Sequence, residues 1–172
     1  MQVVKNSFIA LLVFWFAVLL FMPKQELYYA LEKNLATQGI EINEKEIDEG
    51  LFSLNLMQVS IFYKGIKVAT VEKINIFTLL FTSNINVKSL VLDESLKSFA
   101  PEKIEIANIT HSIFSPSSVN ITATGSFGES EGMVDLTNRQ MRLDFTNTTK
   151  ELDRIRTHLQ KDEKGLYYET SF

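Results

Sequence analysis

From Ile40 onward the sequence alternates apolar and polar residues, and this period of two restricts the fold more than any other feature. These stretches are rich in Ile, Val, Phe, Thr and Asn, of which the β-branched and aromatic residues favour pleated strands. Connections such as Lys64-Gly65 and Asn138-Arg139 are too short for a parallel crossover. The sequence therefore predicts an antiparallel meander of about six to eight strands over residues 40–146. The expected strands are 40–47, 52–63, 66–77, 85–92, 104–114, 119–127, 133–136 and 141–145.

The apolar phase changes within the second of these strands. Leu54 and Leu56 share one face of an ideal strand, whereas Val59 and Ile61 share the other. A β-bulge near Leu56 and Met57 would insert one residue and bend the strand. We therefore expect a curved sheet.

Two helices are expected beside the sheet. The first spans residues 24–38, because Pro23 suits a helix start, Gly39 suits a helix end, and Leu27, Leu31 and Leu35 recur every four residues. This leucine face either packs on the sheet of the same domain or binds a helix of a partner. A second helix is expected over residues 150–160, with Leu152, Ile155 and Leu159 on one face.

Fifteen consecutive apolar residues, 8–22, precede the first of these helices. Bulky and charged residues follow the run where signal peptidase needs small ones, so an uncleaved membrane anchor is favoured over a removed signal peptide. The expected division is a transmembrane anchor over residues 1–23 and one α+β domain over 24–172. Lys5 and the positive-inside rule favour a cytoplasmic N-terminus. The residues expected to contact lipid are Phe8, Leu12, Trp15, Leu19 and Met22.

Charge and composition exclude several functions. The net charge of the chain is −4, and Lys5 is the only charged residue before Pro23, which argues against a nucleic-acid-binding surface. The absence of cysteine excludes disulfides, thiolate metal sites and cysteine nucleophiles. Three N-x-[ST] triplets, at Asn108, Asn120 and Asn147, are interpreted as ordinary strand and loop residues.

No catalytic or metal-binding pattern stands out. His111 and His158 have no partner at a fixed spacing, and each is interpreted as an ordinary surface or hydrogen-bonded residue. The acidic stretch 43–50 is interrupted by Lys45 and does not have the glycine position of a calcium loop. The glycines Gly125, Gly128 and Gly132 match no phosphate-binding motif and are expected to form a turn. We therefore expect a protein that is not an enzyme and has no cofactor.

The order of these parts resembles a known group of bacterial envelope proteins. After the apolar run and the leucine helix come LFSLNLMQV at 51–59, YKGI at 63–66, GSFG at 125–128 and GMVDLTNRQMRL at 132–143. Over most of residues 20–146 this pattern resembles the periplasmic part of type II secretion system protein N and the wider AsmA-like group. The resemblance implies a single-pass inner-membrane protein with a curved periplasmic β-domain that acts in secretion or in lipid handling. It supplies no site residues.

Two functions follow as alternatives. The first is a non-enzymatic scaffold that binds other secretion or envelope proteins, through a free sheet edge or through the leucine face of residues 24–38. The second is a lipid carrier whose concave sheet face accepts acyl chains, with Val87 and Val91 as candidate residues of that face. Apolar residues on both faces of a strand also occur when both faces are covered by the protein itself.

Overall fold

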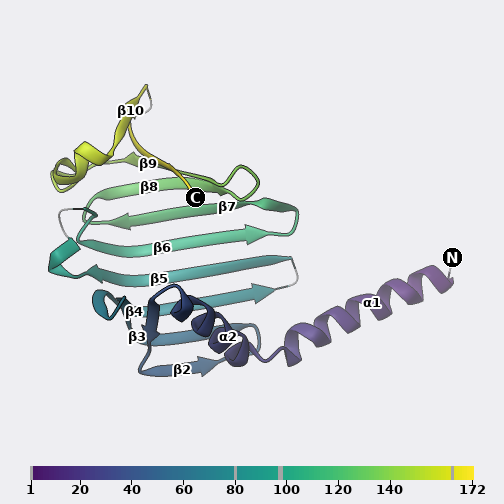
Figure 1. The fold of residues 1–172 in the computed structure, drawn as a ribbon. Coiled ribbons are helices and arrows are strands. Elements are labelled where there is room, and N and C mark those ends of the chain that lie inside the picture. Colours follow the sequence, from purple (N-terminus) through teal and green to yellow (C-terminus); the bar gives the residue numbers. More distant parts are fainter. Residues whose placement is uncertain (1, 80, 97–98, 164) are drawn as a thin grey trace.

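The computed structural model describes residues 2–79, 81–96, 99–163 and 165–172, with the exception of the Leu19 side chain. Eleven strands form one antiparallel sheet, and two α-helices precede it (Figure 1). The helices are α1 (Gln2–Phe21) and α2 (Lys24–Thr37), with short 3-10 helices η1 (Glu94–Leu96) and η2 (Leu152–His158). The strands are β1 (Ile40–Asn43), β2 (Glu46–Glu49), β3 (Ser53–Tyr63), β4 (Ile66–Leu79), β5 (Thr82–Leu92), β6 (Lys103–Ser112), β7 (Ser115–Gly125), β8 (Gly128–Asp135), β9 (Gln140–Thr146), β10 (Gln160–Asp162) and β11 (Gly165–Ser171).

The strands follow the chain in space, in the order β1-β3-β4-β5-β6-β7-β8-β9-β11-β10. The predicted antiparallel meander is confirmed, since each strand from β3 to β8 pairs with the next. The sheet has more strands than the six to eight expected, because the stretch 40–47 divides into β1 and β2, which pair with opposite ends of β3, and because β10 and β11 follow residue 146. The predicted α+β class is wrong: the described chain is mainly an antiparallel β-sheet, in which the helices supply few core residues.

Short turns fix the register of the meander. Lys64 and Gly65, with φ of 50° and 80°, connect β3 to β4, because two positive φ values match the twist of a tight hairpin. The predicted glycine turn is also present: Gly125 pairs with Gly128, whose φ is 109°. Asn138 and Arg139 lie in the turn that joins β8 to β9, as expected.

The C-terminal segment differs from the prediction. The helix expected over residues 150–160 is the 3-10 helix η2, and the aromatic tail after Gly165 is β11. β11 pairs with β9, and Tyr168 lies opposite Leu143. The tail contains Tyr167 and Tyr168, which are good strand formers, and the free edge of β9 offers them backbone partners.

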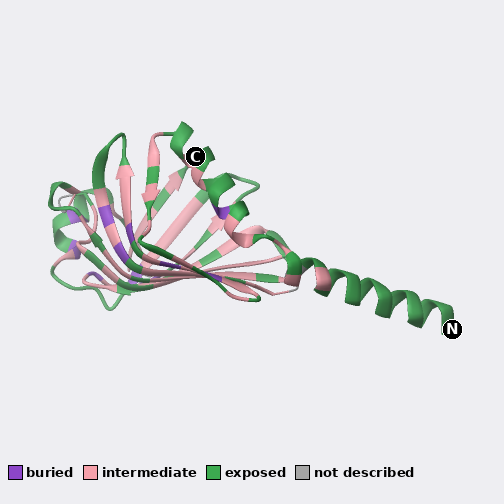
Figure 2. Ribbon diagram, turned by 90° about the horizontal axis from the view of Figure 1, so that it is seen from below, coloured by how far each residue is buried: buried purple, intermediate pink, exposed green. Residues whose placement is uncertain are grey.

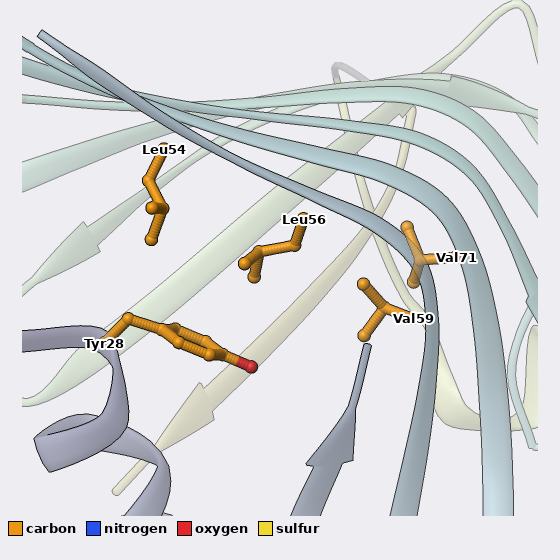
Figure 3. Packing of buried hydrophobic residues seen from close by; sticks show 5 residues of the cluster. All are labelled: Tyr28, Leu54, Leu56, Val59 and Val71. Carbon is orange, nitrogen blue, oxygen red and sulfur yellow. The ribbon is translucent and has the colours of Figure 1, made fainter. Parts of the chain in front are cut away.

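The sheet is bent, and α2 lies on the inner side of the bend (Figures 1 and 2). Its main contacts are with β1, β2 and β3. Tyr28 is the buried residue of α2, and its ring is directed toward Leu54 and Leu56 of β3 (Figure 3). Together with Val59 and Val71 these residues form one of two hydrophobic clusters found among the described residues.

The N-terminal helix α1 extends away from the sheet (Figure 1). Among the residues that the structure describes, no helix is long and apolar enough to cross a membrane, so the predicted transmembrane anchor over residues 1–23 is wrong. The physical reason is length. The first turns of α1 contain Gln2, Lys5 and Asn6, and the fifteen apolar residues 8–22 rise only about 22 Å against a hydrocarbon layer of ~30 Å.

The predicted anchor residues occupy different environments. Phe8, Leu12 and Trp15 are exposed on α1, Met22 is half-buried beside α2, and the side chain of Leu19 lies outside the described residues. The ring of Phe16 contacts Phe52, with 5.5 Å between the centroids. The predicted single-pass location in a bacterial inner membrane, with the domain in the periplasm, is corrected together with the anchor because it depended on it.

Candidate functional site

One face of the sheet carries apolar side chains across nearly all of its strands. The pairing register places one row of residues on this inner face: Leu54, Ile76, Ile85, Ile109, Ile121, Gly132, Leu143 and Tyr168. A parallel row contains Leu56, Ile74, Val87, Ala107, Ala123, Ser130, Phe145 and Leu166. Because residues in register on neighbouring strands share a face, the rows form one continuous surface.

Local backbone conformations keep this face apolar where the sequence changes phase. Gln58 has a φ of 50°, and the buried residues on its two sides are Leu56 and Val59. Met57 pairs with Lys73 and Val59 with Val71, so the register is unchanged across Gln58. The predicted bulge near Leu56 and Met57 is therefore misplaced. The register of β3 against β4 shifts between Ile61 and Phe62 instead, while positive φ at Gln58 turns the next residues inward.

The inner face is covered at its two ends. The first cluster, beneath α2, contains Tyr28, Leu54, Leu56, Val59 and Val71. The second contains Phe127, Phe145, Leu152 and Ile155, and η2 supplies the last two of these. Ile85, Ala107, Ile109 and Ile121 lie between the clusters on strands β5, β6 and β7, and all four are half-buried. We call these four residues the central inner face.

The two covering elements differ in how far their own apolar side chains are buried. η2 buries Leu152 and Ile155, which are 1% and 5% exposed. On α2 only Tyr28 is buried, whereas Leu27 and Leu31 remain 51% and 54% exposed. An apolar pocket of about 200 Å³ lies between α2 and the sheet. Its lining residues are Met22, Lys24, Leu27, Tyr28, Leu31, Phe52, Leu54, Ile76 and Thr78.

Val87 and Val91, the two residues predicted for the concave apolar face, lie on opposite faces of the sheet. Val87 packs against the first cluster on the inner face. Val91 lies on the outer face, because Ser89 has a φ of 52° and Leu90 is the residue that turns inward. Of the predicted leucine face of α2, Leu27 and Leu31 line the pocket and Leu35 is half-buried.

Polar contacts hold the N-terminal part of α2 near the sheet edge. The hydroxyl of Tyr28 donates to Glu44 Oε2 at 2.7 Å, and Lys24 Nζ lies 3.6 Å from Glu49 Oε1. Burial, followed by the hydrogen bond to Glu44, raises the pKa of Tyr28. Burial and the charge of Glu44 raise the pKa of Glu32 as well. These contacts attach α2 to the edge of the sheet.

Both histidines contact neighbouring residues of the fold. His111 Nε2 lies 3.1 Å from the carbonyl oxygen of Pro116, and the ring of His158 lies 6.3 Å from that of Phe99. Within the described ranges, no group of three His, Cys, Asp or Glu residues could hold a metal ion. The inner face is therefore the strongest candidate site, and its chemistry is apolar.

Sequence reasoning missed the organisation of the outer face. The register places Asp48, Asn55, Asn75, Asn86, Asn108 and Thr122 in one polar row across six strands. Asn75 Nδ2 donates to Asn55 Oδ1 at 2.8 Å, and Asn86 Nδ2 donates to Asn108 Oδ1 at 2.6 Å. The asparagines recur at the same phase of successive strands, and this signal could have identified the row.

Near β11, the outer face also has an ion cluster that the sequence did not indicate. Arg142 Nη2 lies 2.6 Å from Asp144 Oδ1 and 2.5 Å from Asp162 Oδ2, and its guanidinium lies 4.0 Å from the ring centroid of Tyr167. The hydrogen bonds to both carboxylates raise the pKa of Arg142. The cluster connects β9, β10 and β11.

The fold and its candidate site define a class: a bent antiparallel sheet with an apolar inner face that is covered at both ends. Comparisons with known protein families, with curated proteins and with solved structures find no match.

Proposed function

We propose that this protein is a non-enzymatic binding protein whose inner sheet face holds the acyl chains of a lipid. The carrying observation is the position of Ile85, Ala107, Ile109 and Ile121 between the two hydrophobic clusters. A sheet that only stabilised itself would be expected to bury such a face under its own helices. Here α2 packs mainly on β1, β2 and β3, and η2 belongs to the other cluster.

The chemistry of the face favours hydrocarbon over other ligands. The central inner face contains only aliphatic side chains, and a hydrocarbon chain gains free energy in proportion to the apolar area that it buries there. A sugar or nucleotide would lose hydrogen bonds to water without replacement on such a surface. The resemblance to the AsmA-like group, which implies lipid handling, supports the same proposal.

The test is mass spectrometry of lipids extracted from the purified protein. Ile121→Glu places a charge on the central inner face, whereas Thr122→Glu places the same charge on the outer face one residue away. We expect lipid with the wild-type protein and with Thr122→Glu, and at least a tenfold loss with Ile121→Glu. Val87→Glu and Val91→Glu form a second pair on opposite faces.

Circular dichroism and thermal unfolding confirm that the compared variants are folded. Folded wild-type protein that carries no lipid would contradict the proposal. Equal lipid content in Ile121→Glu and Thr122→Glu would contradict the assignment to the inner face. If Ile121→Glu does not fold, Ile109→Gln tests the same surface without a charge.

A second candidate function is a scaffold that binds an extended segment of another envelope or secretion protein. The observation that favours it is the edge of β11, where β10 pairs with Gly165–Tyr167 while β11 continues to Ser171. Free backbone groups at such an edge can pair with an added strand. Crosslinking from residue 169 to a secretion or envelope subunit would support this candidate, and a chain that crosslinks to nothing would count against it.

A further inference from the structure

We propose that the pocket beneath α2 receives the methyl end of a single fatty acyl chain and thereby sets the chain length that the protein prefers. This inference rests on the proposed function, because the remainder of the chain would lie on the central inner face. The lining of this pocket includes Leu27, Leu31, Leu54 and Ile76.

The pocket is continuous with the central inner face. Ile76 of β4 is in register with Ile85 of β5, and Ile85 is in register with Ile109 and then Ile121. These positions are successive members of one row, separated by about 4.8 Å per strand. A chain that crosses from Ile121 to Ile76 therefore covers roughly 14 Å of aliphatic surface before it passes beneath α2.

The protein's own side chains leave the pocket incompletely filled. Leu27 and Leu31 belong to the lining but are each about half exposed. By contrast, Leu152 of η2 is fully buried at the opposite end of the face. An apolar occupant beneath α2 would bury the part of both leucines that lines the pocket, which is favourable.

The charged residue of the pocket lining already has a partner. Lys24 belongs to the lining, its side chain is 10% exposed, and its ammonium group is paired with Glu49. A second anionic group in the pocket would compete with Glu49 for Lys24. The other lining residues are almost all apolar, so a carboxylate in the pocket would lose its water without a free partner. The methyl end of a fatty acid therefore suits the pocket, and the carboxylate is expected to remain outside it, at the central inner face.

The experiment measures chain-length preference in the full-length protein. A fluorescent polyene fatty acid is bound first, and saturated fatty acids from decanoic to stearic acid then compete with it. Leu31→Trp reduces the pocket, Leu31→Ala enlarges it, and Tyr29→Trp changes an exposed residue of the same helix that does not line the pocket. We expect Leu31→Trp to shift the preferred chain toward shorter acids and to weaken stearic acid at least tenfold.

Leu31→Ala is expected to shift the preference toward longer acids, and Tyr29→Trp is expected to leave it unchanged. An identical chain-length profile in Leu31→Trp, Leu31→Ala and wild type, with binding still lost in Ile121→Glu, overturns the pocket and leaves the proposed function standing. Wild-type protein that binds no fatty acid of any length and carries no extracted lipid overturns both.

Discussion

The hydroxyl of Tyr28 donates a hydrogen bond to Glu44 Oε2 at 2.7 Å, and this bond joins α2 to the connection between β1 and β2. Tyr28 is the buried residue of α2, and its ring packs on the first hydrophobic cluster. Tyr28 therefore contributes both an apolar and a polar attachment of the helix.

This attachment predicts a stability change at high pH. Burial and the bond to Glu44 raise the pKa of Tyr28, so the folded protein holds the phenolic proton more tightly than the unfolded chain. The contribution is complete below the unfolded pKa of about 10 and is lost as pH rises above it. Urea unfolding at pH 9 and pH 11 should show a smaller pH dependence for Tyr28→Phe than for wild type. An equal dependence would contradict the role of Tyr28.

At Glu32 a neutral substitution is expected to stabilise the protein at neutral pH. Burial and the charge of Glu44 raise the pKa of Glu32, so its ionised form is disfavoured in the folded state. The favourable contribution of the protonated acid exists at low pH and is lost as pH rises through the folded pKa. Glu32→Gln should therefore increase the unfolding free energy at pH 7 and have little effect at pH 3. A decrease at pH 7 would contradict this account.

Truncating a leucine of η2 should lower the unfolding free energy more than truncating a leucine of α2. Leu152→Ala removes a fully buried side chain of η2 and should cost about 2 to 5 kcal/mol of unfolding free energy. Leu31→Ala removes a half-exposed side chain of α2 and should cost less than about 1 kcal/mol. Chemical denaturation of both variants in lipid-free buffer measures the difference. Equal losses would show that α2 is seated as firmly as η2.

The asparagine row on the outer face should contribute to stability. Asn75→Ala removes the donor to Asn55 in a partly buried position and should cost about 1 kcal/mol. The exposed Asn120 lies on the same face, and Asn120→Ala is the matched control, with an expected change within about 0.5 kcal/mol. In thermal unfolding Asn75→Ala should have the lower midpoint temperature of the two variants. Equal midpoints would show that the asparagine row does not stabilise the fold.

Gly132 should resist substitution because the neighbouring strand approaches it closely. A Cβ atom at this position would lie 2.2 Å from the carbonyl oxygen of Arg142 and 2.6 Å from Leu143 Cδ2. Gly132→Ala should therefore force β8 and β9 apart and cost about 1 to 3 kcal/mol. Denaturant titration of this variant checks the value. Stability equal to that of wild type would show that the two strands can separate without loss.

Local sequence patterns predicted the parts of the fold that depend on neighbouring residues. The short connection at Lys64-Gly65 can close only an antiparallel hairpin, so the meander followed from it. The change of phase between Leu56 and Val59 was visible in the sequence, and both residues are buried on one face. Its mechanism was not visible, because a bulge and a positive φ at Gln58 produce the same change of phase.

The tertiary structure decided which surfaces are covered. The leucine period of α2 suited either packing or exposure, and in the structure Tyr28 is buried against β3 whereas Leu31 is half exposed. Val87 and Val91 are four residues apart and would share one face of a regular strand. The positive φ of Ser89 places them on opposite faces instead. The apolar run before Pro23 fixed a helix at α1, but its length did not make a membrane span. Periodicity is a local property of the chain, whereas coverage of a face depends on the competition among all elements for the same apolar surface.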